Sequence, residues 1–272
     1  MEFNKKLKKK WKEKKYVCIG LDPVAEKLPK SLKGKDKVFQ FNRAIIDATA
    51  DVVCAYKPNS AFYEALGAQG IEQLKKTCDY LFKKYPDIAV ILDAKRADID
   101  STNEGYVAFA FDYLKADAIT LHPYLGKQAL QPFLDRKDKG LLILCRTSNG
   151  GAGEFQDLKI KNKPLYRIVA EKVTKNWNDN GNIGFVVGAT YPKELSVIRK
   201  ITGDMPILIP GIGAQGGDLK ASLKSVKKNF LVSSSRGIIF ASSGKDFAKA
   251  AQKEAEILDG QIKKILLNIE DF

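Results

Sequence analysis

The sequence predicts an α/β protein of the (β/α)8 barrel class, the TIM barrel. Eight short apolar runs alternate along 272 residues with stretches of helical periodicity, as in a parallel sheet whose strands are joined by helices. Nearly every run ends in charged, polar or glycine residues. A doubly wound open sheet is the rival, but only a closed barrel brings all these strand ends to one mouth. Barrels of this length form one domain, so we expect a single domain over residues 1–272.

The predicted strands are short runs dominated by apolar residues, as expected where both faces of a sheet are buried. The helices between them carry an apolar stripe with lysine-rich positions on the opposite side. The strands are residues 16–21, 52–56, 88–92, 118–121, 140–145, 183–187, 206–210 and 230–232. The helices are residues 38–51, 61–85, 104–114, 127–134, 164–178, 192–201 and 246–267, after a basic leader helix at 1–15.

Two connections have features of their own. Residues 101–104, Ser-Thr-Asn-Glu, have the spacing of a capping box at the start of a helix. The polar, glycine-bearing segment 150–163 is long for a connection between a strand and a helix, and it therefore predicts a lid over the barrel mouth.

The net charge of +14 is concentrated near the N-terminus, where eight lysines against one glutamate give +7 between residues 5 and 15. Such a run could attract nucleic acid. Since the lysines are not interleaved with a series of aromatic residues for stacking bases, Trp11 being the one aromatic residue among them, we expect instead a solvated, partly frayed helix and no nucleic-acid partner. The remaining positive charge would help to attract an anionic substrate.

The sequence also predicts the compartment. No apolar run approaches the roughly 18 residues that span a bilayer, and no apolar segment follows the basic N-terminus as in a secretory signal. The four cysteines lie in apolar or helical patterns without a Cys-x-x-Cys pair, so we expect buried free thiols in a reducing compartment. They are Cys18, Cys54, Cys78 and Cys145. We therefore expect a cytoplasmic protein that does not bind membranes.

Charged residues follow the third predicted strand, where Asp93, Lys95 and Asp98 come after an apolar run. Residues i and i+2 of a strand share a face, so Asp93 and Lys95 project the same way. An ion-paired loop without a function is the alternative. Charges that end a buried strand usually have a partner or a task, so we expect an acid–base–acid row at the barrel mouth.

Other strand ends add Asp22, Lys57, His122 and Ser148. Two lysines among carboxylates create a strong local field, and a lysine in such a field can act as a general acid. For His122 we favour a structural or supporting role. Because it is the only histidine in the chain, metal sites that need two histidines are excluded.

Phosphate in barrels is often held by the loops after the seventh and eighth strands. The glycine-rich residues 211–217 follow the seventh strand, and their backbone N–H groups could approach an anion closely. Arg236 follows the eighth strand and offers a bidentate phosphate partner. Together they predict a phosphate site.

These motifs resemble those of one known family, the orotidine 5′-monophosphate decarboxylases, and the Asp-Ala-Lys-Arg-Ala-Asp-Ile form at 93–99 resembles their type 2 branch. The similarity runs from about residue 17 to 239. Its motifs are Gly20-Leu21-Asp22, Lys57-Pro58-Asn59, residues 93–99, Thr147-Ser148-Asn149, Gly213-Ala214-Gln215-Gly216-Gly217 and Ser235-Arg236-Gly237. The chain departs from the family at Gly150, where proline is common.

The resemblance implies decarboxylation of orotidine 5′-monophosphate to uridine 5′-monophosphate without a cofactor or metal. It implies that Lys95 protonates C6 of the pyrimidine, beside Asp93, and that Lys57 holds the row and contacts the ribose. Asp22 would accept from a ribose hydroxyl, Ser148 would bind the pyrimidine amide edge, and Gln215 and Arg236 would bind phosphate. Asp98 and Thr102 would reach into the partner's site in a homodimer.

The nearest alternative is a magnesium-dependent sugar-phosphate decarboxylase or aldolase with the same Asp-x-Lys-x-x-Asp barrel motif. Such enzymes hold the metal partly through an acidic residue after the second strand, where this chain has Lys57. An ammonium group there would repel a divalent cation. A basic nucleic-acid-binding protein on a barrel scaffold is the alternative from another class, and a charge concentrated in the leader disfavours it.

Overall fold

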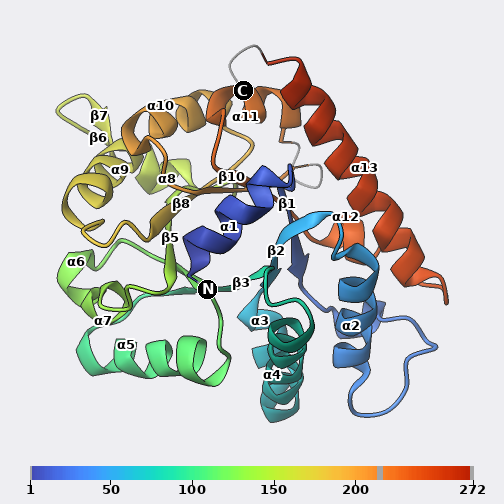
Figure 1. The fold of residues 1–272 in the computed structure, drawn as a ribbon. Coiled ribbons are helices and arrows are strands. Elements are labelled where there is room, and N and C mark those ends of the chain that lie inside the picture. Colours follow the sequence, from blue (N-terminus) through green and yellow to red (C-terminus); the bar gives the residue numbers. More distant parts are fainter. Residues whose placement is uncertain (1, 213–216, 270–272) are drawn as a thin grey trace.

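The computed structural model describes residues 2–212 and 217–269, which form a closed barrel of parallel strands surrounded by helices (Figure 1). Around the barrel the strands follow the order β1-β10-β9-β8-β5-β4-β3-β2, so the first strand pairs with both the second and the last. The predicted (β/α)8 barrel is therefore confirmed. The barrel strands are β1 (Val17–Leu21), β2 (Val53–Pro58), β3 (Ala89–Arg96), β4 (Ala118–Leu121), β5 (Gly140–Arg146), β8 (Ile183–Val187), β9 (Ile207–Pro210) and β10 (Phe230–Ser234).

The helices pack on the outside of the strands, and each buries one apolar face. These faces and the outward-facing strand residues form the larger of two core layers. The smaller layer fills the barrel interior with inward-facing residues such as Leu142, Val186 and Leu231. The helices are α1 (Phe3–Lys12), α2 (Lys37–Thr49), α3 (Ser60–Glu64), α4 (Gly67–Lys84), α5 (Asp100–Val107), α6 (Gly126–Ala129), α7 (Gln131–Leu134), α8 (Gly153–Gln156), α9 (Leu165–Asn176), α10 (Pro192–Thr202), α11 (Leu219–Val226), α12 (Arg236–Ile239) and α13 (Phe247–Leu267), with η1 (Ala25–Lys27) and η2 (Ala108–Tyr113).

The prediction of a solvated, frayed leader helix was wrong. Helix α1, blue in Figure 1, lies across the N-terminal end of the barrel and buries Phe3 and Leu7 in the inner core layer. A β-carbon at Gly140, the first residue of β5, would lie 2.2 Å from the Phe3 ring, so the missing side chain makes room for the aromatic plug. Lys6 is also buried and pairs with Asp117 at 2.8 Å. Two of the eight lysines, Lys6 and Lys10, are thus buried, and α1 closes the end of the barrel opposite the mouth.

Several predicted connections differ in detail. The helix predicted over 61–85 is two helices, α3 and α4, because Gly67 has a φ of +61° at the break. The capping box at 101–104 does not form, since α5 already begins at Asp100 and has no side-chain cap. Segment 150–163, predicted to be a lid, contains α8 and β6 (Lys159–Ile160), which pairs antiparallel with β7 (Lys163–Pro164) at the end of the segment.

Candidate active site

A cavity of about 1230 Å³ opens at the carboxyl ends of the barrel strands. Side chains on or just after the last residues of β1, β2, β3, β4, β5 and β10 all contribute to its wall, as a closed barrel requires. Among the residues predicted from sequence, the cavity is lined by Asp22, Lys57, Asp93, Lys95, His122, Ser148 and Arg236. Strand ends that are far apart in sequence are therefore brought together around one space.

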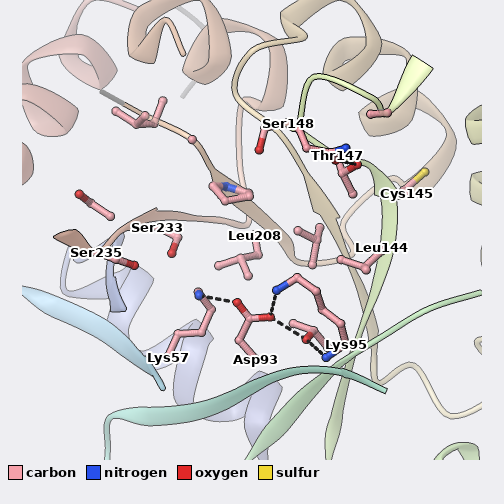
Figure 2. Close-up of a pocket in the computed structure, with 18 of the residues that line it drawn as sticks. Lys57, Asp93, Lys95, Leu144, Cys145, Thr147, Ser148, Leu208, Ser233 and Ser235 are labelled. Atoms are coloured by element: carbon pink, nitrogen blue, oxygen red, sulfur yellow. Dashed lines mark hydrogen bonds and ion pairs between the residues drawn. The ribbon is translucent and has the colours of Figure 1, made fainter. Parts of the chain in front are cut away.

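The cavity floor holds a row of alternating charges, drawn with dashed lines in Figure 2. The Nζ of Lys57 donates to Asp93 Oδ2 at 2.7 Å, and the Nζ of Lys95 donates to Asp93 Oδ1 at 2.6 Å. Asp93 and Lys57 are buried, whereas the Lys95 side chain is 44% exposed. One carboxylate thus orients two ammonium groups, of which Lys95 is the one open to the cavity.

The charges of this row are mutually stabilised. Burial disfavours the charged form of Asp93, but the ammonium groups of Lys57 and Lys95 outweigh burial and hold its pKa well below the usual 3.8. Burial likewise disfavours the charge on Lys57, yet Asp93 and Asp22 raise its pKa above the usual 10.5. Asp93 and Lys57 therefore remain ionised at neutral pH and present a fixed field to the cavity.

Thr120 on β4 completes the row, although sequence reasoning gave it no role. Its hydroxyl donates to Asp93 Oδ1 at 2.9 Å and accepts from the backbone N–H of Lys95 at 2.9 Å. Lys95 has a φ of +47°, a left-handed conformation that is strained for a lysine and often marks a functional position. The signal in the sequence was a single polar residue inside a buried, otherwise apolar strand.

Asp22 lies beside Lys57 at the end of β1. Its Oδ1 is buried without a hydrogen-bond donor among the described residues, and such an acceptor is costly unless a ligand supplies one. A β-carbon at Gly20, two residues earlier, would lie 1.8 Å from the Ser235 hydroxyl. The glycine therefore lets the ends of β1 and β10 approach closely, which brings Asp22 towards the residues after β10.

Ser148 lies after β5, across the cavity from Lys57 and Asp93, as Figure 2 shows. A β-carbon at Gly188 would lie 2.7 Å from the Ser148 β-carbon, so the close packing of the two strand ends requires glycine there. His122 also lines the cavity, where burial and the charge of Lys95 lower its pKa below 6.5. The neutral form of His122 is thus favoured.

The remaining predicted residues divide into three cases. Arg236, the first residue of α12, is exposed and lines the cavity next to Ser235. Gln215 lies outside the described residues. Asp98 and Thr102 do not line the cavity; Asp98 accepts from the N–H of Ile99 at 2.8 Å, and Thr102 is exposed on α5.

No helix in the described part of the chain combines the length and apolar character needed to cross a membrane. The four cysteines are buried free thiols, as predicted.

Comparison with known proteins identifies the family. The family model "Orotidine 5'-phosphate decarboxylase / HUMPS family" matches residues 15–252. The orotidine 5′-phosphate decarboxylase of Janthinobacterium sp. (strain Marseille) is 48% identical over 261 residues, covering 94% of this chain and 96% of that protein. Among solved structures, Leishmania donovani OMP decarboxylase has a TM-score of 0.84 at 36% identity, covering 98% of this chain and 99% of its own. Leishmania donovani UMP synthase has a TM-score of 0.87 at 38% identity, and the match spans 98% of this chain but 57% of that protein. This chain therefore belongs to the orotidine 5′-phosphate decarboxylase / HUMPS family.

Proposed function

We propose that this chain decarboxylates orotidine 5′-monophosphate to uridine 5′-monophosphate and CO2, the last step of de novo pyrimidine nucleotide synthesis. The observation that carries the proposal is the Lys57–Asp93–Lys95 row on the floor of the cavity, with Lys95 facing the open space. Similarity to decarboxylases over nearly the whole length of both chains supports it. The magnesium-dependent alternative is disfavoured because the ammonium group of Lys57 already pairs with the Asp93 carboxylate and would repel a divalent cation.

In the reaction, the bond between C6 and the carboxylate carbon breaks, CO2 leaves, and the electron pair remains on C6. Lys95 donates a proton from Nζ to this carbanion, and the resulting neutral amine later regains a proton from solvent. The carbanion has little resonance stabilisation, so the fixed charges around C6 must supply most of the barrier reduction. Lys95 is held at 2.6 Å from Asp93 before substrate arrives, and this preorganisation lowers the cost of orienting it in the transition state.

Asp93 and Lys57 act through their charges. In our proposal Asp93 lies against the substrate carboxylate, so the repulsion between the two anions is relieved when CO2 departs. Lys57 compensates the Asp93 charge and contacts the ribose. Because Lys57 and Asp93 are both buried, their pair keeps its geometry better than an exposed ion pair would.

The rest of the cavity binds the nucleotide away from the reacting carbon. We propose that the unpartnered Oδ1 of Asp22 accepts from a ribose hydroxyl and that Ser148 binds the amide edge of the pyrimidine. Gln215 and Arg236 bind the phosphate. Binding energy from the phosphate is remote from C6 and can therefore drive orientation of the base over Lys95.

We also propose a homodimer with shared sites, in which Asp98 and Thr102 contribute to the partner's cavity. Asp98 is part of the motif but does not line the cavity of its own subunit. Three large apolar side chains are exposed near this position. Ile99, next to Asp98, is 56% exposed, and Tyr124 and Leu125, which follow β4, are 87% and 47% exposed. Apolar side chains of this size around a barrel mouth favour burial against a second copy.

We further propose that the whole chain is one domain working in the cytoplasm, without nucleic acid or a metal. Packing of α1 into the inner core supports its inclusion in the domain. The free thiols suit a reducing compartment. The lysine-rich leader uses Lys6 to pair with Asp117, which removes part of the charge that nucleic acid would need.

The test compares wild type with Lys95→Ala on orotidine 5′-monophosphate, followed by the loss of its absorbance. We expect turnover by wild type only, while both proteins bind uridine 5′-monophosphate. Lys127→Ala, which changes an exposed lysine paired with Asp179 outside the cavity, is the matched control and should remain active. Full activity of Lys95→Ala would refute the assignment of the proton donor.

A further inference from the structure

Arg146, the last residue of β5, is a buried cation with no role in the reaction described so far. It is 2% exposed and is among the largest fully buried side chains of the protein. It precedes Thr147 and Ser148, both of which line the cavity, yet Arg146 itself is not among the lining residues. Its charged group therefore lies behind the cavity wall on the pyrimidine side.

The position of the guanidinium follows from an irregularity in the sheet. The register between β5 and β8 shifts between Leu144 and Arg146, which breaks the alternation that places Leu144 in the barrel interior. The guanidinium carbon instead lies 3.6 Å from the ring centroid of Tyr191, just before α10. A desolvated cation is attracted to the face of an aromatic ring, so the Tyr191 ring holds the Arg146 guanidinium in one position.

From this position the Arg146 guanidinium hydrogen-bonds to segment 150–163. Its Nη2 donates to Asp157 Oδ2 at 3.0 Å, and its Nη1 donates to Gln156 Oε1 at 3.4 Å and to the Thr147 carbonyl at 3.2 Å. Gln156 also binds Thr147 directly: its Oε1 accepts from the Thr147 N–H at 2.9 Å and its Nε2 donates to the Thr147 hydroxyl at 2.9 Å. The segment is thus tied to the residue immediately before Ser148.

These contacts couple the segment to the buried charge. Asp157 is the only carboxylate that pairs with Arg146 within residues 2–212 and 217–269, and its side chain is 48% exposed. If the segment lifted away, Arg146 would keep the Tyr191 ring and the Thr147 carbonyl but lose its counter-ion. Leaving a buried cation without its partner is costly, so Arg146 favours the docked position.

The backbone of Arg146 also helps to position Ser148, through Gly188 after β8. The carbonyl of Arg146 accepts from the N–H of Gly188 at 2.8 Å, and Gly188 is the residue whose missing side chain makes room for Ser148. Docking of the segment and placement of Ser148 therefore share one backbone stretch.

We propose that Arg146 is a positioning residue for the decarboxylation, acting through Asp157 and Gln156. It holds segment 150–163 docked at the pyrimidine side of the cavity and, by the same contacts, holds Ser148 in place for the base. The inference rests on the proposed function for the role of Ser148, whereas the docking itself does not depend on the reaction.

The experiment compares Arg146→Met, Arg146→Lys, Asp157→Asn and the double variant Arg146→Met/Asp157→Asn. Two quantities are measured: the rate of trypsin cleavage after Lys161, in the exposed turn of the segment, without substrate; and kcat and KM for orotidine 5′-monophosphate. We expect faster cleavage and a KM raised about tenfold for Arg146→Met, the fold-change of one charge-assisted hydrogen bond, with a smaller change in kcat. Arg146→Lys should recover part of the loss.

The double variant separates a shared contact from two independent effects. If Arg146 acts through Asp157, the double variant is no worse than Arg146→Met alone. Arg136→Met, which removes an arginine paired with Asp112 outside the cavity, is the matched control and should leave cleavage and KM unchanged. Should Arg146→Met fail to fold, Asp157→Asn alone decides, because its half-exposed side chain can be changed without disturbing the core.

Wild-type cleavage and KM in Asp157→Asn would overturn the proposal, as would a folded Arg146→Met that differs from wild type only in thermal stability. Absence of turnover by wild type would instead refute the proposed function, since the cleavage rates still report on docking.

Discussion

Replacing Thr120 by valine removes one hydroxyl and keeps the shape of the side chain. That hydroxyl joins the Asp93 carboxylate to the backbone of Lys95, at 2.9 Å on each side. A hydrogen bond to a charged group contributes about 1.5–3 kcal/mol and a neutral one about 1 kcal/mol, so we expect the free energy of unfolding to fall by about 2–4 kcal/mol. If the hydroxyl also orients Lys95, kcat/KM falls about 10- to 100-fold, equivalent to about 1.4–2.8 kcal/mol of transition-state stabilisation.

Thr49→Val is the matched control. Thr49 is 1% exposed on α2, its hydroxyl donates to the Ile45 carbonyl at 2.8 Å and pairs with the Tyr56 hydroxyl at 2.7 Å, and it does not line the cavity. Urea unfolding and the absorbance assay are applied to both variants. We expect similar losses of stability, but a kcat/KM within about twofold of wild type for Thr49→Val. If Thr120→Val loses stability and keeps its kcat/KM, Thr120 does not orient Lys95 and the reasoning is refuted.

Three further predictions concern phosphate, the shared site and pH. Arg236→Ala should lower kcat/KM for the nucleotide by a factor equivalent to several kcal/mol of transition-state stabilisation, as expected for losing a charge-assisted bidentate contact. The loss should be far smaller for a substrate without phosphate; an equal loss with both substrates would mean that Arg236 is structural. Asp98→Asn and Lys95→Ala homodimers should each be nearly inactive, yet regain activity when mixed, because one site of the mixed dimer carries neither change; no recovery after exchange confirmed by mass spectrometry would place Asp98 in its own site. The ionised form of Asp93, with its lowered pKa, stabilises the fold above the unfolded pKa and loses this effect as pH falls through the folded pKa. The difference in unfolding free energy between wild type and Asp93→Asn should therefore be constant between about pH 5 and pH 8 and shrink below about pH 4; a change between pH 6 and pH 8 would contradict it.

The fold and the floor of the cavity followed from local patterns. Apolar runs ending in charge placed Asp93 and Lys95 at the mouth of a barrel, because strand periodicity is local in the sequence and the strand ends of a barrel meet at one mouth. Asp22, Lys57 and Ser148 were found in the same way, each as the polar residue after a strand. All five line the cavity.

The residues that were missed depend on contacts between distant segments. Thr120 is one polar residue in a buried strand, and only the pairing of β3 with β4 shows that it bridges Asp93 and Lys95. Arg146 looked like an ordinary strand end, since neither the register shift nor Tyr191 is visible in its local sequence.

The leader helix was mispredicted for a related reason. Eight lysines suggested a solvated helix, but Phe3 and Leu7 share one face with Lys6, and that face is covered by the inner barrel core. Long lysine side chains can bury their stems while the ammonium group finds a partner, here Asp117. Composition alone therefore hid the apolar stripe.

The most direct test of the central claim is the loss of orotidine 5′-monophosphate absorbance on addition of the purified protein in excess chelator. In the proposed mechanism the Lys57–Asp93–Lys95 row supplies both the field and the proton, so we predict the same initial rate with and without chelator, with uridine 5′-monophosphate and CO2 formed in equal amounts. Activity that vanishes with chelator and returns with magnesium, or no conversion under either condition, would contradict it.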